Sequence, residues 1–215
     1  MFAVIFDVDG VLVDSEGMSC GAWLPVLRRR GIAVRLAEIE DFIGRSDRAV
    51  LDRFRRLHPA ADLGDHLIDE KEQEFFAAAR GRLRAFAGLK RVLRRLESGG
   101  VPMAVASSGR HRKIRFSLKT AGLEGFFDAV CSASDVARGK PAPDLFLRAA
   151  GLLGADPGIC SVVEDSVPGI AAAKAAGMKA LGFTSSHPAG VLLDAGADAV
   201  FSRYDELPDL LPGES

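Results

Sequence analysis

The sequence predicts an α/β protein with a Rossmann-like parallel sheet as its core and a small α-helical cap domain inserted after the first strand. Short unbroken apolar runs recur along the chain, as is typical of strands buried on both faces. Helical patterns of about ten residues separate most of these runs, as the crossovers of a parallel sheet require. The stretch 15–85 breaks the alternation, because it carries helical patterns alone.

The predicted core elements follow one another in a regular order. The strands are expected at Phe2–Phe6, Pro102–Ala106, Ala129–Cys131, Cys160–Val163, Met178–Phe183 and Ala197–Phe201. The intervening helices are expected at Leu89–Leu96, Ile114–Ala121, Asp144–Leu153 and Val167–Ala176. Their apolar residues recur at the three- and four-residue spacing of a helix face, and glycines follow three of them as stop signals.

The inserted stretch carries three apolar stripes. One runs through Val50, Leu51, Phe54 and Leu57, with Ser46 as its expected N-cap, and a second runs through Ile68, Phe75 and Ala79. The third surrounds Trp23, where Pro25 is expected to kink the helix. We therefore expect a core formed by residues 1–14 and 86–215, and a cap formed by residues 15–85. The segments Val11–Ser15 and Leu83–Gly88 are the expected hinges.

Charge and cysteine usage narrow the functional class. The 215 residues contain 28 Lys and Arg against 29 Asp and Glu, for a net charge of −1. That balance argues against nucleic acid or an anionic membrane surface as a partner. The three cysteines form no CxxC pair, and the apolar N-terminal run has no preceding basic residues. We expect reduced thiols and a cytoplasmic protein that is a monomer or a weak homo-oligomer.

Polar side chains gather where the predicted strands end. Asp7 and Asp9 follow the first strand, Ser107 the second, and Glu164 and Asp165 the fourth. A loop bounded by prolines adds Lys140. Functional groups of open α/β sheets collect at the carboxyl ends of the strands. Two carboxylates two residues apart can serve there as nucleophile and as general acid or base. The set therefore predicts a site for phosphate and a metal ion.

Four segments carry a family resemblance that spans nearly the whole chain. DVDGVLVDS, SSG, GKPAPD and VVEDSVPGI resemble the four motifs of the haloacid dehalogenase superfamily. The insertion point resembles the branch of beta-phosphoglucomutase-like phosphatases, which has a small helical cap. The resemblance implies a Mg²⁺-dependent phosphatase that acts on a small phosphorylated metabolite, such as a sugar or polyol phosphate, through an aspartyl-phosphate intermediate.

The same resemblance implies roles for individual residues. Asp7 matches the nucleophile, and Asp9 matches the acid that protonates the leaving oxygen and later activates water. Ser107 and Lys140 match the groups that hold the phosphoryl oxygens. The metal ligands that it implies are Asp7, Asp9 through its carbonyl, Glu164 and Asp165. Because Asp9 has to be protonated for the first step, we expect burial and like-charged neighbours to raise its pKa above the usual ~3.9.

Two further segments are candidates for substrate binding. The turn Gly44, Arg45, Ser46 lies between predicted cap helices, where a guanidinium suits a phosphate or a carboxylate. The second segment follows the second strand and comprises Ser108, Gly109, Arg110 and His111.

Two alternatives remain open. One is a phosphosugar mutase. Mutases of this branch carry a cap histidine at the position of Ser19, so the serine argues against this alternative. The other is a non-catalytic phosphate-binding or regulatory module, which would be expected to have lost one of the core motif residues.

Overall fold

A computed structural model of the chain describes residues 2–212 and contains a six-stranded parallel sheet in the order β3-β2-β1-β4-β5-β6. The strands are β1 (Ala3–Phe6), β2 (Met103–Ser107), β3 (Ala129–Ser132), β4 (Cys160–Glu164), β5 (Lys179–Phe183) and β6 (Ala199–Phe201). This is the predicted Rossmann-like fold. The first strand lies at the centre, between β2 and β4, so their carboxyl ends meet at one edge of the sheet.

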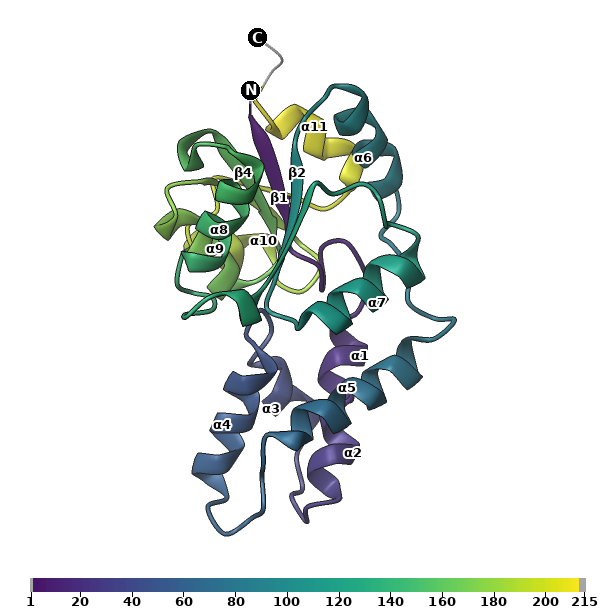
Figure 1. Cartoon of the computed structure of the whole chain (residues 1–215). Coiled ribbons are helices and arrows are strands. Elements are labelled where there is room, and N and C mark those ends of the chain that lie inside the picture. Colours follow the sequence, from purple (N-terminus) through teal and green to yellow (C-terminus); the bar gives the residue numbers. More distant parts are fainter. Residues whose placement is uncertain (1, 213–215) are drawn as a thin grey trace.

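Helices cover both faces of the sheet (Figure 1). One face carries α6 (Leu89–Ser98), α7 (His111–Ala121) and α11 (Leu207–Leu210), and the other carries α8 (Asp144–Leu153), α9 (Val167–Ala175) and α10 (Ala189–Asp194). Single 3-10 turns lie at Ala133–Asp135, Pro157–Ile159 and Tyr204–Glu206.

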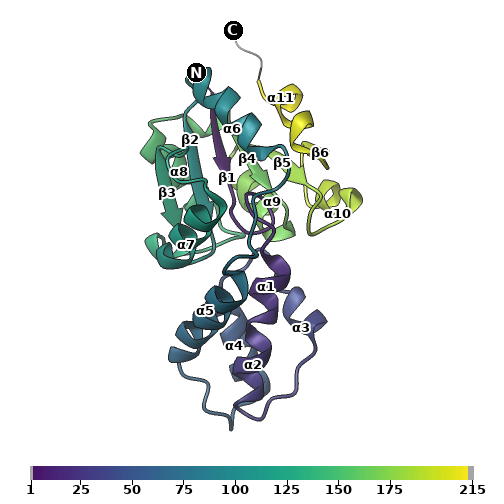
Figure 2. The ribbon, with the colours of Figure 1, turned by 90° about the vertical axis from the view of Figure 1, so that its right-hand side faces the viewer.

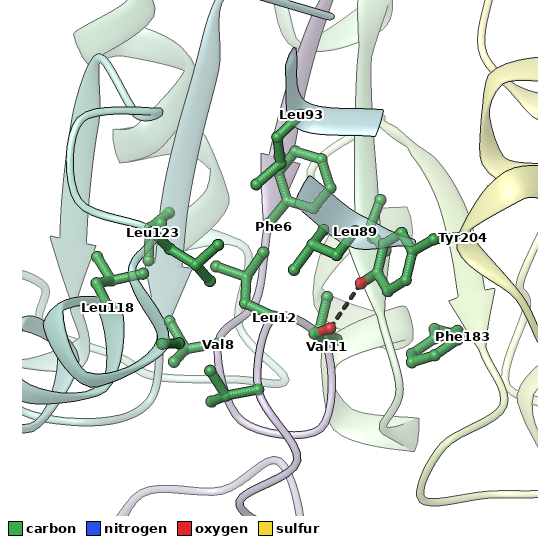
Figure 3. Packing of buried hydrophobic residues seen from close by; sticks show 14 of the residues in the cluster. Phe6, Val8, Val11, Leu12, Leu89, Leu93, Leu118, Leu123, Phe183 and Tyr204 are labelled. Carbon is green, nitrogen blue, oxygen red and sulfur yellow. Dashed lines mark hydrogen bonds between the residues drawn. The ribbon is translucent and has the colours of Figure 1, made fainter. Parts of the chain in front are cut away.

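The packing of β1 explains why its sequence is one unbroken apolar run. Val4 and Phe6 pack into the cluster beneath α6 and α7, while Ala3 and Ile5 pack into the cluster beneath α8 and α9. Successive side chains of a strand point to opposite faces, so a strand covered on both sides has no polar position. The hydroxyl of the buried Tyr204 closes the first cluster by donating to the carbonyl of Val11 at 2.6 Å (Figure 3).

Five helices lie between β1 and α6 and extend from the carboxyl edge of the sheet (Figure 2). They are α1 (Glu16–Gly21), α2 (Trp23–Arg28), α3 (Leu36–Glu40), α4 (Asp47–Leu57) and α5 (His66–Ala79). The hydroxyl of Ser46 accepts from the amide of Ala49, so the predicted N-cap of α4 is confirmed. The helical run around Trp23 is interrupted at Ala22, three residues before Pro25, which agrees with the expected disturbance by this proline. Pro25 stands in the first turn of α2 and has no N–H to bond the carbonyl of Gly21, the last residue of α1.

Helix α5 belongs to two hydrophobic clusters. Leu67 and Ile68 pack with the other inserted helices, whereas Phe75, Phe76 and Ala79 pack with residues of the sheet domain. The two connecting segments lie side by side, since the amide of Asp14 donates to the carbonyl of Arg84 at 3.1 Å, and an isolated bridge pairs Val13 with Ala85. We retain residues 15–85 as the proposed cap, with α5 as the element that packs on both units.

Candidate active site

A small cavity of about 50 Å³ lies between the carboxyl edge of the sheet and the inserted helices. Asp7, Asp9 and Ser107 line it from the sheet side together with Lys113 from α7. The inserted helices and turns contribute Glu16, Ser19, Cys20, Trp23, Ile39, Phe42, Ile43, Gly44, Arg45, Asp47 and Val50. Three of the residues predicted at the strand ends therefore form one wall of the cavity, and the inserted helices and turns form the other.

Lys140 joins two of the strand ends. Its buried Nζ lies 2.5 Å from Oδ1 of Asp7 and 2.5 Å from Oε1 of Glu164. An ammonium between two buried carboxylates offsets much of their mutual repulsion. Burial nevertheless raises the pKa of Asp7 to about 8, because the attraction of Lys140 is opposed by the charges of Glu164 and Asp9. The ionised form of Asp7 is therefore costly at this buried edge of the sheet, and a cation bound there would favour it.

Glu164 has both carboxylate oxygens engaged. Oε1 faces Lys140, while Oε2 accepts from the amides of Asp165 and Ser166 at 3.0 and 3.1 Å and from the Ser166 hydroxyl at 2.8 Å. These donors are at the start of α9, where a carboxylate is favoured. The geometry fits a role in holding Lys140 better than the metal-ligand role predicted from the sequence.

Asp165 is buried directly after β4, and the loop after β5 holds it there. Oδ2 accepts from the hydroxyl of Ser186, and the Asp165 carbonyl lies 2.8 Å from Nδ1 of His187. The approach to Gly10 is very close, because a Cβ built on Gly10 would lie 1.9 Å from Oδ2 of Asp165. Burial, followed by the charges of Glu16, Glu164 and Asp7, raises the pKa of Asp165 well above its usual value.

The expectation of a raised pKa for Asp9 is wrong. Burial is the largest single influence and favours the neutral acid, but the ammonium of Lys113, 2.8 Å from Oδ2, acts against it together with Ser15 and the charge of Lys71. The Ser15 hydroxyl adds a hydrogen bond to Oδ1 at 2.5 Å, and the pKa of Asp9 is lowered. Lys113 is 104 positions from Asp9 along the chain, so no local sequence pattern announces their contact.

Two buried lysines converge on Ser19, and sequence reasoning missed both. Lys71 of α5 and Lys113 of α7 each lie 3.0 Å from the Ser19 hydroxyl oxygen. Lys71 also lies 2.8 Å from the carboxylate of Asp47, which accepts from the Trp23 indole at 3.2 Å. One signal in the sequence could have found Lys71. It is a charged residue on the apolar stripe of α5, at a buried position between Ile68 and Phe75. Glu16, at the mouth of the cavity, was missed as well.

The predicted cap turn reaches the site only in part. Gly44 and Arg45 line the cavity, and the carbonyl of Gly44 accepts from the Ser108 hydroxyl at 2.9 Å. Ser46 instead caps α4. On the sheet side, Ser108 and Gly109 line the cavity as expected for substrate-binding residues.

Neither Arg110 nor His111 is among the described residues that line the cavity. The Arg110 guanidinium forms an ion pair with Asp69 of α5, and Nε2 of His111 lies 2.8 Å from Oδ1 of Asp135. Their predicted contact with substrate is not supported, because each is directed to a carboxylate outside the cavity. Arg110 instead links α5 to the sheet domain.

The donors at the carboxyl edge fit a magnesium ion. Among residues 2–212, no three acidic, histidine or cysteine side chains are grouped as a metal centre. Mg²⁺ does not need such a group, because it is bound by one or two carboxylates together with substrate phosphate and water. Asp7 and Asp165 supply two buried carboxylates, and burial, with the charges of neighbouring acids, raises the pKa of both. A divalent cation would favour their ionised forms.

Comparison with known proteins identifies the class. Residues 1–177 match the haloacid dehalogenase-like hydrolase family, and the chain belongs to this family. The predicted resemblance is thus confirmed. No helix of the described residues has the length and apolar character needed to cross a membrane.

The relatives include phosphatases that align along most of their length. Validoxylamine A 7'-phosphate phosphatase of Streptomyces hygroscopicus subsp. limoneus is 33% identical over 89% of each chain. Fructose-1-phosphate phosphatase of Escherichia coli is 33% identical over 83% of this chain and 94% of its own. The Arabidopsis thaliana protein SUPPRESSOR OF QUENCHING 1 is 32% identical over 99% of this chain, which spans only 21% of that relative's length.

A solved structure agrees with this assignment. A hydrolase of the same family from Deinococcus radiodurans, determined with bound phosphate and sodium, is 36% identical and superposes with a TM-score of 0.72. The match covers 96% of this chain and 93% of that one. The chain is therefore an enzyme of the phosphatase class within the haloacid dehalogenase-like hydrolases, as predicted.

Proposed function

We propose that this enzyme hydrolyses a sugar or polyol phosphate through an aspartyl-phosphate intermediate and requires Mg²⁺. The observation that carries the proposal is the convergence of Asp7, Lys140 and Asp165 at the carboxyl edge, beside a cavity that the inserted helices cover. The phosphate bound by the related hydrolase and the sugar phosphate named for the Escherichia coli relative support it.

The proposed reaction has two steps. An oxygen of Asp7 attacks phosphorus while the bond from phosphorus to the ester oxygen breaks, and Asp9 gives its proton to the leaving alcohol. Asp9 then takes a proton from water, whose oxygen attacks the phosphoryl group on Asp7 and releases phosphate. Lys140 and Ser107 hold the phosphoryl oxygens. Bound Mg²⁺, held by Asp7, the Asp9 carbonyl and Asp165, would neutralise charge on the transferring group.

The lowered pKa of Asp9 fits the second step directly. With Lys113 in contact, Asp9 is held as the carboxylate, which is the form that accepts a proton from water. For the first step Asp9 needs a proton, so the contact with Lys113 has to weaken when substrate and metal enter.

The lining of the cavity favours a polyhydroxylated substrate and hydrolysis. Glu16, Ser19 and Asp47 offer hydrogen bonds suited to hydroxyl groups. None of the described residues lining the cavity is a histidine, which disfavours the mutase alternative.

The test is phosphate release from a panel of sugar, polyol and other metabolite phosphates with Mg²⁺, beside Asp7→Asn. We expect release by the parent chain, at least about 10³-fold less in the variant because the nucleophile is lost, and none after exhaustive chelation until Mg²⁺ is restored. Turnover that survives chelation would exclude the metal role. Isomerised sugar phosphate without net release would identify a mutase, and no reaction in either assay would support the non-catalytic module.

A further inference from the structure

A groove on the sheet domain, about 610 Å³ in volume, lies apart from the candidate active site. Four basic side chains line it: Arg84 from the segment that joins α5 to α6, Lys90 and Arg91 from α6, and Lys119 from α7. It shares none of its lining residues with the cavity at the carboxyl edge. Its volume lies in the range of small-molecule sites.

The basic side chains of this groove differ from four arginines of the inserted helices, although Arg28, Arg53 and Arg56 there also have no ion pair among the described residues. On the inserted helices, Arg29, Arg30, Arg48 and Arg55 all form ion pairs with carboxylates. Within residues 2–212, none of the four groove cations has a carboxylate within ion-pair distance, and Arg84 donates to backbone carbonyls only. Arg203, and to a smaller extent Arg91, lower the pKa of Asp205, but the ion pair of Asp205 is with Arg203.

The local helix chemistry makes this arrangement unfavourable for folding. Lys90 and Arg94 stand four positions apart on α6, as do Arg115 and Lys119 on α7, and like charges at that spacing destabilise a helix by roughly 0.2–0.5 kcal/mol per pair. Lys90 and Arg91 also lie in the first turn of α6, where positive charge opposes the helix dipole. Lys119, by contrast, lies in the last turn of α7, where positive charge is favoured. Folding stability therefore does not explain Lys90 and Arg91, whereas an anion in the groove would compensate their charges.

We propose that this groove binds a small polyphosphate anion. A single phosphate engages two cations well, whereas a chain of two or more phosphates carries enough charge to face all four. The concave shape suits a compact ligand better than a long polymer. The chain's overall charge of −1 makes the concentration of unpaired cations here a local feature. Bound to the groove, the anion would contact the segment Arg84–Gly88, which enters the sheet domain from α5.

The experiment is calorimetric titration with inorganic tripolyphosphate in chelator, where metal-dependent turnover is absent. Arg91→Ala with Lys119→Ala removes two groove cations, and Arg53→Ala with Arg56→Ala removes two exposed cations of α4 and is the matched control. We expect saturable binding at sub-millimolar concentration, weakened at least about tenfold by the groove pair and unchanged by the control pair. The amide resonances of Lys119–Gly122 should shift on binding.

Several outcomes would overturn the proposal. Equal losses in the two pairs would show a general effect of charge, and amide shifts confined to the carboxyl edge would show binding at the active site. A DNA duplex or anionic vesicles that bind through the groove while tripolyphosphate does not would identify a different partner. ATP that binds more tightly than tripolyphosphate would support the groove and identify a nucleotide as the source of the phosphates, whereas equal affinities would indicate the phosphate chain alone.

Discussion

Lys113 connects the carboxylate proposed as acid and base to the inserted helices, through Oδ2 of Asp9 and the hydroxyl of Ser19. Lys113→Met removes the cation that offsets the burial of Asp9. We expect hydrolysis of the aspartyl phosphate, and with it turnover of the best panel substrate, to slow about 10- to 100-fold, because the base form that the second step needs is lost when the pKa of Asp9 rises. Arg115→Met, an exposed change on the same helix, is the control. An unchanged kcat in Lys113→Met would show that Asp9 does not depend on this lysine.

Gly10 sets the position of Asp165. Its φ of 73° and the 1.9 Å approach of a built Cβ to Oδ2 both require glycine. We expect Gly10→Ala to displace the Asp165 carboxylate and weaken Mg²⁺ binding about tenfold or more, measured by calorimetry without substrate. Gly81→Ala is the matched control, because Gly81 has a φ of 68° and nothing within 4 Å of a built Cβ. Equal Mg²⁺ affinity in the two variants would contradict a role for Asp165 in metal binding.

At the scale of elements, α5 and α7 form the contact between the inserted helices and the sheet domain. Arg110 pairs with Asp69, Nη1 of Arg112 lies 3.6 Å from Glu72, and Phe116 packs against Phe76 with ring centroids 4.5 Å apart. The Glu72 side chain is 2% exposed, and its Oε2 has no hydrogen-bond partner among the described residues. This contact therefore contains one poorly compensated buried carboxylate.

Glu72→Gln tests that contact. Burial raises the pKa of Glu72, so the folded protein holds the proton more tightly than the unfolded chain. The ionised form destabilises the fold as pH rises above the ordinary Glu pKa, and the penalty is complete above the raised value. We expect Glu72→Gln to increase the free energy of unfolding by about 1 kcal/mol at neutral pH and to have no effect near pH 4. Denaturant titrations at both pH values measure this. A variant less stable at neutral pH would show that the ion pair with Arg112 dominates.

The elements themselves were largely predictable, and their long-range contacts were not. Asp144–Leu153 matches α8 and the last residue of every predicted strand lies within one residue of the observed end, because local apolar periodicity and glycine stops define these elements. The short helices α1, α3, α10 and α11 were missed, since each is too short for a repeated stripe. Asp7, Asp9 and Ser107 were found from the carboxyl-end rule. Lys71 and Lys113 were not, because their partners come from distant parts of the chain.

At the scale of the whole molecule, the turn at Gly44 is a second close contact between the inserted helices and the sheet domain. Its φ is 82°, and a Cβ built there would lie 2.1 Å from the Ser166 hydroxyl. That hydroxyl cannot easily yield, because it donates to Glu164 at 2.8 Å and accepts from the Gly169 amide at 3.1 Å. A side chain at position 44 therefore opposes the closed arrangement of the cap over the site.

We expect Gly44→Ala to shift the population toward an open cap. In an open molecule Arg45 and Lys71 are withdrawn from the carboxyl edge, so kcat/KM should fall about 100-fold while the fold is kept. Small-angle scattering should report a larger radius of gyration. Gly31→Ala shares the backbone strain, with a φ of 75°, but meets nothing within 4 Å, and isolates the effect of closure. If both variants lose activity equally while the radius of gyration is unchanged, backbone strain in the cap explains the loss. The contact between the cap and Ser166 would then not control turnover.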